Sequence, residues 1–122
     1  MAVTRFADFP LAERGRKWDG DAADKRVRQW AGADDKPNAK YRSAHVWYDA
    51  EKKDQFGSYK LLIADVIADE LKVVPRAVMA AGAIMQGGRG GIDLPEKDIP
   101  RVKSHLAKYY KKMGDEPPWA RD

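Results

Sequence analysis

Two stretches of the sequence carry residues that could bind an anion, and the first is the basic run from Arg101 to Lys112. This run contains five basic residues and no acid. On a helix, Arg101, Lys108, Lys111 and Lys112 fall on the face opposite the apolar stripe. Each of them could neutralise a nucleic-acid phosphate and release a counterion. The alternative interpretation is a solvated helix face that keeps the protein soluble.

The second stretch is the glycine-rich loop from Gly87 to Gly91, in which Arg89 is the one large residue. Free backbone N–H groups in such a loop can form an anion-binding nest, and Arg89 could reach a phosphate from it. The loop lacks the lysine and hydroxyl residue of a P-loop, so nucleoside triphosphate binding is not indicated. In the alternative interpretation, the glycines cap one helix and let the chain reverse before the next.

The remaining reactive side chains do not indicate a catalytic site. The chain has no cysteine and two histidines, which excludes cysteine nucleophiles and thiolate zinc sites. No nucleophile-elbow or metal-binding signature surrounds any candidate residue, so we expect no enzyme activity, no metal and no small-molecule cofactor. His105 is interpreted as a residue at the border of a helix's apolar stripe rather than as a base. The candidates considered are Ser43, His45, Asp49, Ser58, Asp65, Ser104 and His105.

These residues need elements to position them, and the central one is a helix that begins at Pro75 and ends before Gly87. Its interior, residues 77–85, contains only alanine, valine, methionine, isoleucine and one glycine. A helix that is apolar on every side is predicted to be buried. Arg76 would then need a partner, either an internal carboxylate such as Asp65 or an external anion.

Residues 41–74 change from helical periodicity to a β-type pattern. The runs at 43–49, 58–67 and 70–74 are rich in β-branched and aromatic residues. Only Ala68-Asp69 separates the last two runs, which is short enough for a tight hairpin. We therefore predict a small antiparallel sheet of about three strands, packed against the buried helix because such a sheet needs a covered face.

Amphipathic helices are predicted before and after this unit. The first has Asp21 as its N-cap and ends at Gly32, and the second ends at Gly114. The fold class is therefore α+β. The apolar positions at helical spacing are Ala23, Val27 and Trp30 in the first helix, and Val102, Leu106, Tyr109 and Met113 in the second.

With 122 residues, the chain is predicted to form a single domain. Residues 1–20 are expected to form an arm that packs on the body through its aromatic side chains. Residues 115–122 are expected to form an extended tail. Trp119 follows two prolines in this tail, and it is either a docking residue for a partner or a side chain that folds back onto its own domain.

Four short runs occur together in this sequence. They are GSYKL from Gly57, VPRA from Val74, GRGG from Gly88, and LAKYY from Leu106 followed by PPW at 117–119. Their combination resembles a small domain of tailed-phage and prophage gene products that is sometimes attached to prohead (capsid-maturation) proteases. The resemblance spans residues 18–119 and implies a phage-related origin. It implies no catalytic residues, because the serine and histidine motifs of the protease have no counterpart here.

Composition narrows the possible partners. The chain has 23 basic and 19 acidic residues, a net charge of +4 that permits an acidic partner. It has no apolar run of membrane-spanning length and no signal-peptide pattern, so a cytoplasmic protein is expected. The leading hypothesis is a non-catalytic, phage-related module that binds DNA or RNA through the basic helix face and the Arg89 loop. The alternative is a protein–protein module of capsid or virion assembly.

Overall fold

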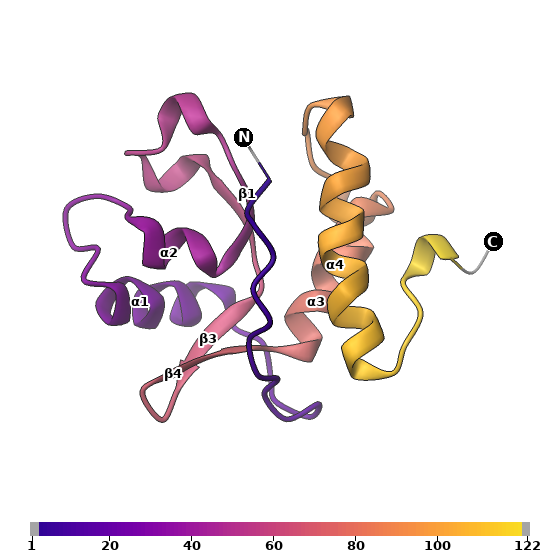
Figure 1. The fold of residues 1–122 in the computed structure, drawn as a ribbon, viewed down its shortest axis with the longest axis horizontal. Helices are drawn as coiled ribbons and strands as arrows, with labels where there is room; N and C mark the ends of the chain where they lie inside the picture. The colour runs from indigo at the N-terminus through magenta and orange to yellow at the C-terminus, as the bar shows by residue number, and fades with distance from the viewer. Residues whose placement is uncertain (1–2, 121–122) are drawn as a thin grey trace.

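The structure is a computed structural model, and it describes residues 3–120 apart from the side chain of Arg89. The fold is α+β, as predicted. Helices α1 (Gly20–Ala31) and α2 (Ala39–Ser43) lie with the strands on one side of the molecule, and α3 (Pro75–Met85) and α4 (Ile99–Met113) form the other side (Figure 1). Buried residues from both sides form one hydrophobic core.

The strands form two separate antiparallel pairs, so the prediction of one sheet with about three strands is wrong. β1 (His45–Tyr48) pairs with β2 (Tyr59–Leu62), and β3 (Ala64–Ile67) pairs with β4 (Glu70–Val73). The run predicted as one strand at 58–67 is thus divided between β2 and β3.

The division falls where the chain changes partner. Leu61 has a positive φ of 60°, which lies in the left-handed region. The strand bends there because this conformation is not extended. Ile63 then donates its N–H to the Ala44 carbonyl at 3.1 Å, while its own carbonyl accepts from Val74 N at 2.9 Å. One residue therefore connects the two pairs. After it, the chain continues as β3 with a new neighbour.

The tight hairpin predicted at Ala68-Asp69 is confirmed. Both residues have positive φ, 53° and 64°, as a two-residue turn matching the strand twist requires. The strand predicted from residue 43 begins later, at His45, because α2 includes residue 43. Asn38 caps α2 by accepting a hydrogen bond from Tyr41 N at 2.9 Å.

The predicted C-terminal ends of α1 and α4 agree with the structure, but the predicted N-cap of α1 does not. Gly32 and Gly114 end α1 and α4 with φ of 67° and 79°, as predicted. The N-cap of α1 is Asp19 instead of Asp21, since the Asp19 carboxylate accepts from the backbone of the first turn. Asp98 does not cap α4 through its side chain, because its carboxylate accepts from Trp47 Nε1 at 3.0 Å.

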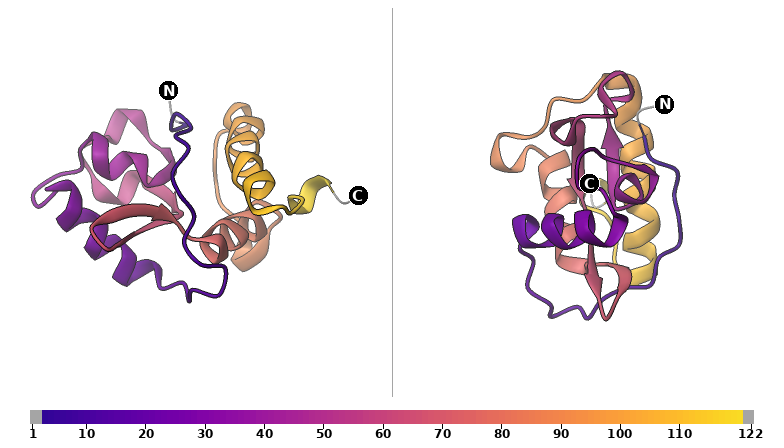
Figure 2. Two further views of the ribbon diagram at one scale, coloured as in Figure 1. Left: turned by 60° about the horizontal axis from the view of Figure 1, so that its bottom comes forward. Right: turned by 90° about the vertical axis from the view of Figure 1, so that its left-hand side faces the viewer.

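The first part of the N-terminal arm, residues 3–12, runs between the two sides of the molecule (Figures 1 and 2). Thr4 N donates to the Val46 carbonyl of β1 at 2.8 Å, and Ala12 N donates to the Val73 carbonyl of β4 at 2.9 Å. On the other side, the Tyr109 hydroxyl of α4 donates to the Ala7 carbonyl. The arm is therefore attached to both halves by hydrogen bonds.

Helix α3 is not buried on every side, which corrects the prediction from its composition. Ala77, Val78 and Ala81 are buried, but Met79 is 37% exposed and Ala83 is also exposed. Helix α4 packs against α3, and Met79 lies where the cover of α3 is incomplete. Some apolar residues of α3 are thus not buried in the core.

The prediction that an internal carboxylate such as Asp65 pairs with Arg76 is also wrong. Arg76 is exposed, and Asp65 is held by other arginines. Arg26 of α1 donates to both carboxylate oxygens of Asp65 at 2.8 Å, and Arg16 donates to one of them at 3.1 Å. The buried carboxylate of β3 therefore ties the arm and α1 to the second strand pair.

Gly82 sets the distance between α3 and α4, and substituting it is expected to destabilise the protein. A Cβ at Gly82 would lie 2.1 Å from the Tyr110 Oη of α4. We expect Gly82→Ala to lower the free energy of unfolding by about 2 kcal/mol because overpacking outweighs the better helix propensity of alanine. Urea denaturation measures the change. Tyr110→Phe should restore part of the loss, and a Gly82→Ala variant as stable as the wild type would contradict this packing.

Candidate nucleic-acid interface

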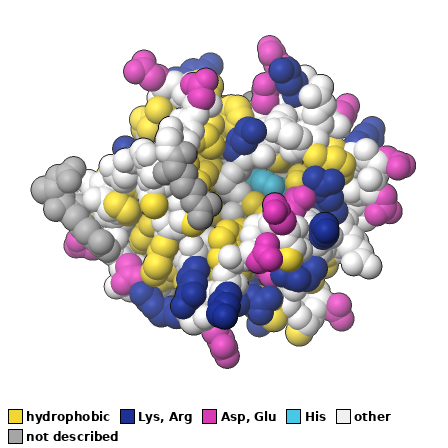
Figure 3. All heavy atoms as spheres, turned by 180° about the vertical axis from the view of Figure 1, so that it is seen from behind, with side chains coloured by type: hydrophobic (Ala, Val, Ile, Leu, Met, Phe, Trp, Pro, Cys, Tyr) yellow, Lys and Arg dark blue, Asp and Glu magenta, His cyan; other side chains and the backbone are white. Residues whose placement is uncertain are grey.

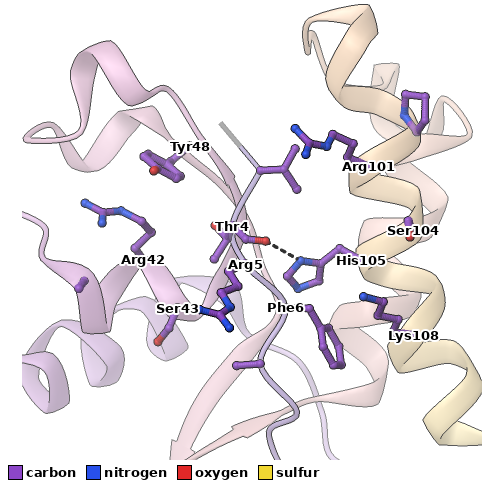
Figure 4. A pocket seen from close by; sticks show the side chains of 14 residues that line it. Thr4, Arg5, Phe6, Arg42, Ser43, Tyr48, Arg101, Ser104, His105 and Lys108 are labelled. Carbon is purple, nitrogen blue, oxygen red and sulfur yellow. Dashed lines mark hydrogen bonds between the residues drawn. The ribbon is translucent and has the colours of Figure 1, made fainter. Parts of the chain in front are cut away.

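A groove of about 1060 Å³ lies between the arm, α4 and the opposite half of the molecule. In the close-up, the arm runs between two walls: α4 on one side, and α2 with the end of β1 on the other (Figure 4). Residues 3–7 of the arm line the groove along its length. The groove therefore exists only where three segments distant in sequence meet.

Basic side chains line this groove from all three segments. Arg5 comes from the arm, Arg42 from α2, and Arg101 and Lys108 from α4. Among the described residues of the lining, none carries a carboxylate. Hydroxyl groups that can hydrogen-bond to phosphate oxygens accompany the charges, and they belong to Thr4, Ser43, Tyr48 and Ser104.

Two of the cations lie on aromatic rings. Lys108 Nζ lies 4.9 Å from the centre of the Phe6 ring, and the Arg42 guanidinium lies 4.7 Å from the centre of the Tyr48 ring. Cation–π contacts position a cation while leaving its full charge. Arg42 also donates to the Tyr59 hydroxyl at 3.3 Å, which fixes its orientation further. Both charges are thus held in place and remain available to an anion.

His105 joins α4 to the arm at the centre of the groove. It is buried, where the sequence suggested a border position, and its Nδ1 donates to the Thr4 carbonyl at 3.0 Å (Figure 4). Burial lowers the pKa of His105, against the hydrogen bond to Thr4, and Lys108 lowers it further. The ring is therefore neutral at neutral pH, and it positions the arm without adding charge.

The structure divides the basic helix face predicted from the sequence. Arg101 and Lys108 line the groove together, while Lys111 is exposed on α4 outside the lining. Lys112 binds the arm, donating to Asp8 Oδ1 and to the Phe9 carbonyl at 2.8 Å each. One turn of α4 thus attaches the arm, and the preceding turns present charge to the groove.

Sequence reasoning missed Arg5 and Arg42. Arg5 has no basic residue beside it and Arg42 has only Lys40 nearby, so neither belongs to a long basic run. The only local signal is aromatic: Arg5 precedes Phe6 in the arm, and Arg42 follows Tyr41. Their contribution to one charged surface depends on tertiary packing.

The Gly87–Gly91 loop has a structural use that its sequence also suggested. Gly87, Gly90 and Gly91 have positive φ values of 93°, 83° and 76°. A Cβ at Gly88 would lie 2.8 Å from the Ala83 carbonyl oxygen. Four glycines are therefore needed for the turn itself. The side chain of Arg89 lies outside the described residues, and its role in anion binding stays a prediction.

Trp119 folds back onto its own domain. Its ring lies edge-on to Tyr110 of α4 with centroids 6.0 Å apart, and Lys103 Nζ lies 5.5 Å from its ring centre. The tryptophan is half-buried in a short 3-10 turn, Pro118–Ala120. A docking role for Trp119 stays a prediction, and it would require the tail to leave α4 or to present the open face of the ring.

The described residues define a small α+β domain with a basic groove between its halves. The chain matches no family model, no curated protein and no solved structure. Within residues 3–120, no helix has the length and apolar character to cross a membrane. The same residues contain no group of three or more histidine, aspartate or glutamate side chains placed to hold a metal ion.

Proposed function

We propose that this protein is a non-catalytic module that binds the backbone of a nucleic acid in the basic groove. The observation that carries the proposal is the lining of the groove, which includes Arg5, Arg42, Arg101 and Lys108 and no described carboxylate. Four cations on a concave surface favour a polyanion, since each phosphate that they neutralise releases a counterion.

The contacts are of the kind that position a nucleic acid without reading its sequence. Arginine, lysine and hydroxyl groups bind phosphate oxygens, which are the same at every nucleotide. The groove presents no asparagine or glutamine among its described lining residues for bidentate recognition of a base edge. We therefore expect similar affinity for different sequences of the same strand type.

Fluorescence anisotropy with labelled single-stranded and double-stranded DNA and RNA tests this function. We expect micromolar binding at low salt that weakens steeply toward physiological salt. Reversing two groove charges, Arg5→Glu with Lys108→Glu, should raise the dissociation constant at least about tenfold and make the salt dependence shallower by about two phosphate contacts.

Matched variants separate the groove from net charge. Lys25→Glu with Lys36→Glu changes the net charge equally at two exposed positions outside the groove lining, and it should leave affinity within about threefold. Lys111→Glu tests the helix face apart from the groove. If Lys111→Glu weakened binding as much as the groove pair, the groove would not be the site. A wild-type protein that binds no nucleic acid at low salt would contradict the proposed function itself.

The phage-related origin expected from the sequence remains a hypothesis beside this proposal, as does the capsid-assembly alternative. In the capsid-assembly alternative, the tail is the docking segment and Trp119 is its docking residue. Removal of residues 115–122 should weaken capsid or prohead binding if the alternative holds. It should leave groove-dependent nucleic-acid binding unchanged, since none of the described tail residues, 115–120, lines the groove.

A further inference from the structure

A second hollow, of about 460 Å³, lies between α1, the β1–β2 hairpin and α3. Figure 3 shows the face of the molecule opposite to that of Figure 1. Hydrophobic side chains lie next to a histidine near the middle of this face. The hollow shares no lining residue with the basic groove. Its volume is within the range of pockets that bind small molecules.

Helix α3 forms one apolar wall of the hollow. Ala77, Ala80, Ala81 and Ile84 line it, and three of these four are alanines, whose small side chains leave space. Ala77 and Ala81 are buried in this wall, and Ala80 and Ile84 are partly exposed. Aromatic and branched side chains form the facing walls, namely Trp18, Phe56, Tyr59 and Leu62.

His45 is the buried polar residue of this lining, with 4% of its surface exposed. Its Nδ1 lies 3.0 Å from the Tyr41 carbonyl oxygen, which can only accept a hydrogen bond. The proton is therefore on Nδ1, and Nε2 carries a lone pair. Burial lowers the pKa of His45 to about 4, so the ring is neutral at neutral pH. In the described part of the chain Nε2 makes no hydrogen bond, and it is not sealed from water.

Of the charged residues that line the hollow, Asp24 and Arg28 are engaged within the protein, while Asp21 and Lys60 are exposed. Asp24 accepts from the Tyr41 hydroxyl at 2.6 Å and pairs with Arg28 at 2.9 Å. The Arg28 guanidinium lies 3.8 Å from the centre of the Phe56 ring. A ligand in the hollow thus meets mostly apolar and aromatic surface, with the His45 ring nitrogen as a hydrogen-bond acceptor that is not used within the protein.

We propose that this hollow binds a small planar aromatic molecule that donates one N–H or O–H hydrogen bond to His45 Nε2. The aromatic and alanine walls match a flat apolar ring, and the accessible ring nitrogen of His45 can accept a hydrogen bond from the ligand. The hollow is enclosed by a helix, a hairpin and a second helix, a concave shape that favours a compact molecule over a polypeptide surface. This inference is independent of nucleic-acid binding, because it concerns a different face.

Indole and N-methylindole are the probes that test the proposal, because they differ in the one N–H group. The full chain is titrated with each at neutral pH and followed by two-dimensional 1H–15N NMR. We expect indole to shift the backbone amides of α3 and the β1–β2 hairpin and to bind about tenfold more tightly than N-methylindole. Equal affinity for the two probes, or no saturable shift in these elements, would overturn the proposal.

The variant His45→Phe keeps an aromatic ring and removes the acceptor, so the preference for indole should disappear in it. His105→Phe, the matched change in the basic groove, should keep the preference. A long-range 1H–15N spectrum of the wild-type histidines gives an independent readout that needs no variant. It should show the Nδ1–H tautomer for His45 and a change of the His45 Nε2 resonance on addition of indole. An unchanged Nε2 resonance at saturation would rule out the hydrogen bond.

Discussion

The free energy of unfolding is expected to fall by about 3 kcal/mol between pH 7 and pH 4 because of one side chain, His45. Burial lowers the pKa of His45 from 6.5 to about 4, although the hydrogen bond to the Tyr41 carbonyl and the charge of Asp24 act in the opposite direction. In the unfolded chain the imidazole regains an ordinary pKa near 6.5. The difference of about 2.5 between the two pKa values corresponds to about 3 kcal/mol.

The sign follows from proton counting. Between pH 6.5 and 4, the unfolded chain binds a proton at His45 while the folded chain does not, so lowering the pH favours unfolding. His105 adds to the same trend because its pKa is also lowered, chiefly by burial. The stability supplied by these two residues is complete above about pH 6.5 and decreases below it.

Urea denaturation at a series of pH values measures this dependence. The variant His45→Phe removes one titrating group. Its loss of stability between pH 7 and pH 4 should be smaller than that of the wild type, and the difference between the two losses should be about 3 kcal/mol. The variant also loses the hydrogen bond to Tyr41, but that loss is the same at every pH. If the two proteins showed parallel pH profiles, His45 would not be a neutral buried histidine.

The substitution Asp65→Asn is expected to cost about 3 kcal/mol of stability at neutral pH. Asp65 is 2% exposed, and it accepts hydrogen bonds from Arg26, Arg16 and the backbone of Val66. Removing its charge leaves two guanidinium groups without their counterion beside a buried site. Both arginines are partly exposed and can turn toward water, which keeps the effect at the low end for a broken buried pair.

Asp69→Asn is the matched control, because it makes the same chemical change at an exposed position of the β3–β4 turn. Asparagine also tolerates the positive φ of that position, so its stability should stay within about 0.5 kcal/mol of the wild type. Equal effects of the two substitutions would mean that the arginine pairs with Asp65 contribute nothing. Chemical denaturation of the two variants side by side makes the comparison.

Asp65 also predicts a second, more acidic step in the stability profile. Burial alone would raise the pKa of Asp65, but the hydrogen bonds from Arg26 and Arg16 outweigh it and hold the pKa below its ordinary value of 3.8. The stabilising contribution is therefore present above about pH 4 and is lost as the pH falls through the lower, folded-state pKa. This step lies below the window in which His45 titrates.

Local signals in the sequence predicted the elements that depend on local chemistry. The left-handed glycines at Gly32 and Gly114, the Ala68-Asp69 turn and the apolar stripe of α4 were all readable, because each is decided within a few residues. The division of the strands at Ile63 was not readable. It depends on which distant backbone groups bond to that residue, Ala44 on one side and Val74 on the other.

The composition of α3 misled the prediction for a different reason. An apolar helix is expected to be covered, and the sequence contains no sign that one side of α3 lines a hollow. The same limit applies to the candidate interface. A run of basic residues predicted Arg101 and Lys108, but Arg5 and Arg42 reach the groove only through the path of the arm and the position of α2.

The arm has a consequence for when the groove can exist. Arg14 Nη1 donates to the Met113 carbonyl and Lys112 donates to Asp8, so these contacts join residues separated by 99 and 104 positions in the sequence. The arm is synthesised before α4, which supplies a wall of the groove. The groove therefore cannot form in a nascent chain until α4 has also been synthesised and has packed against the arm.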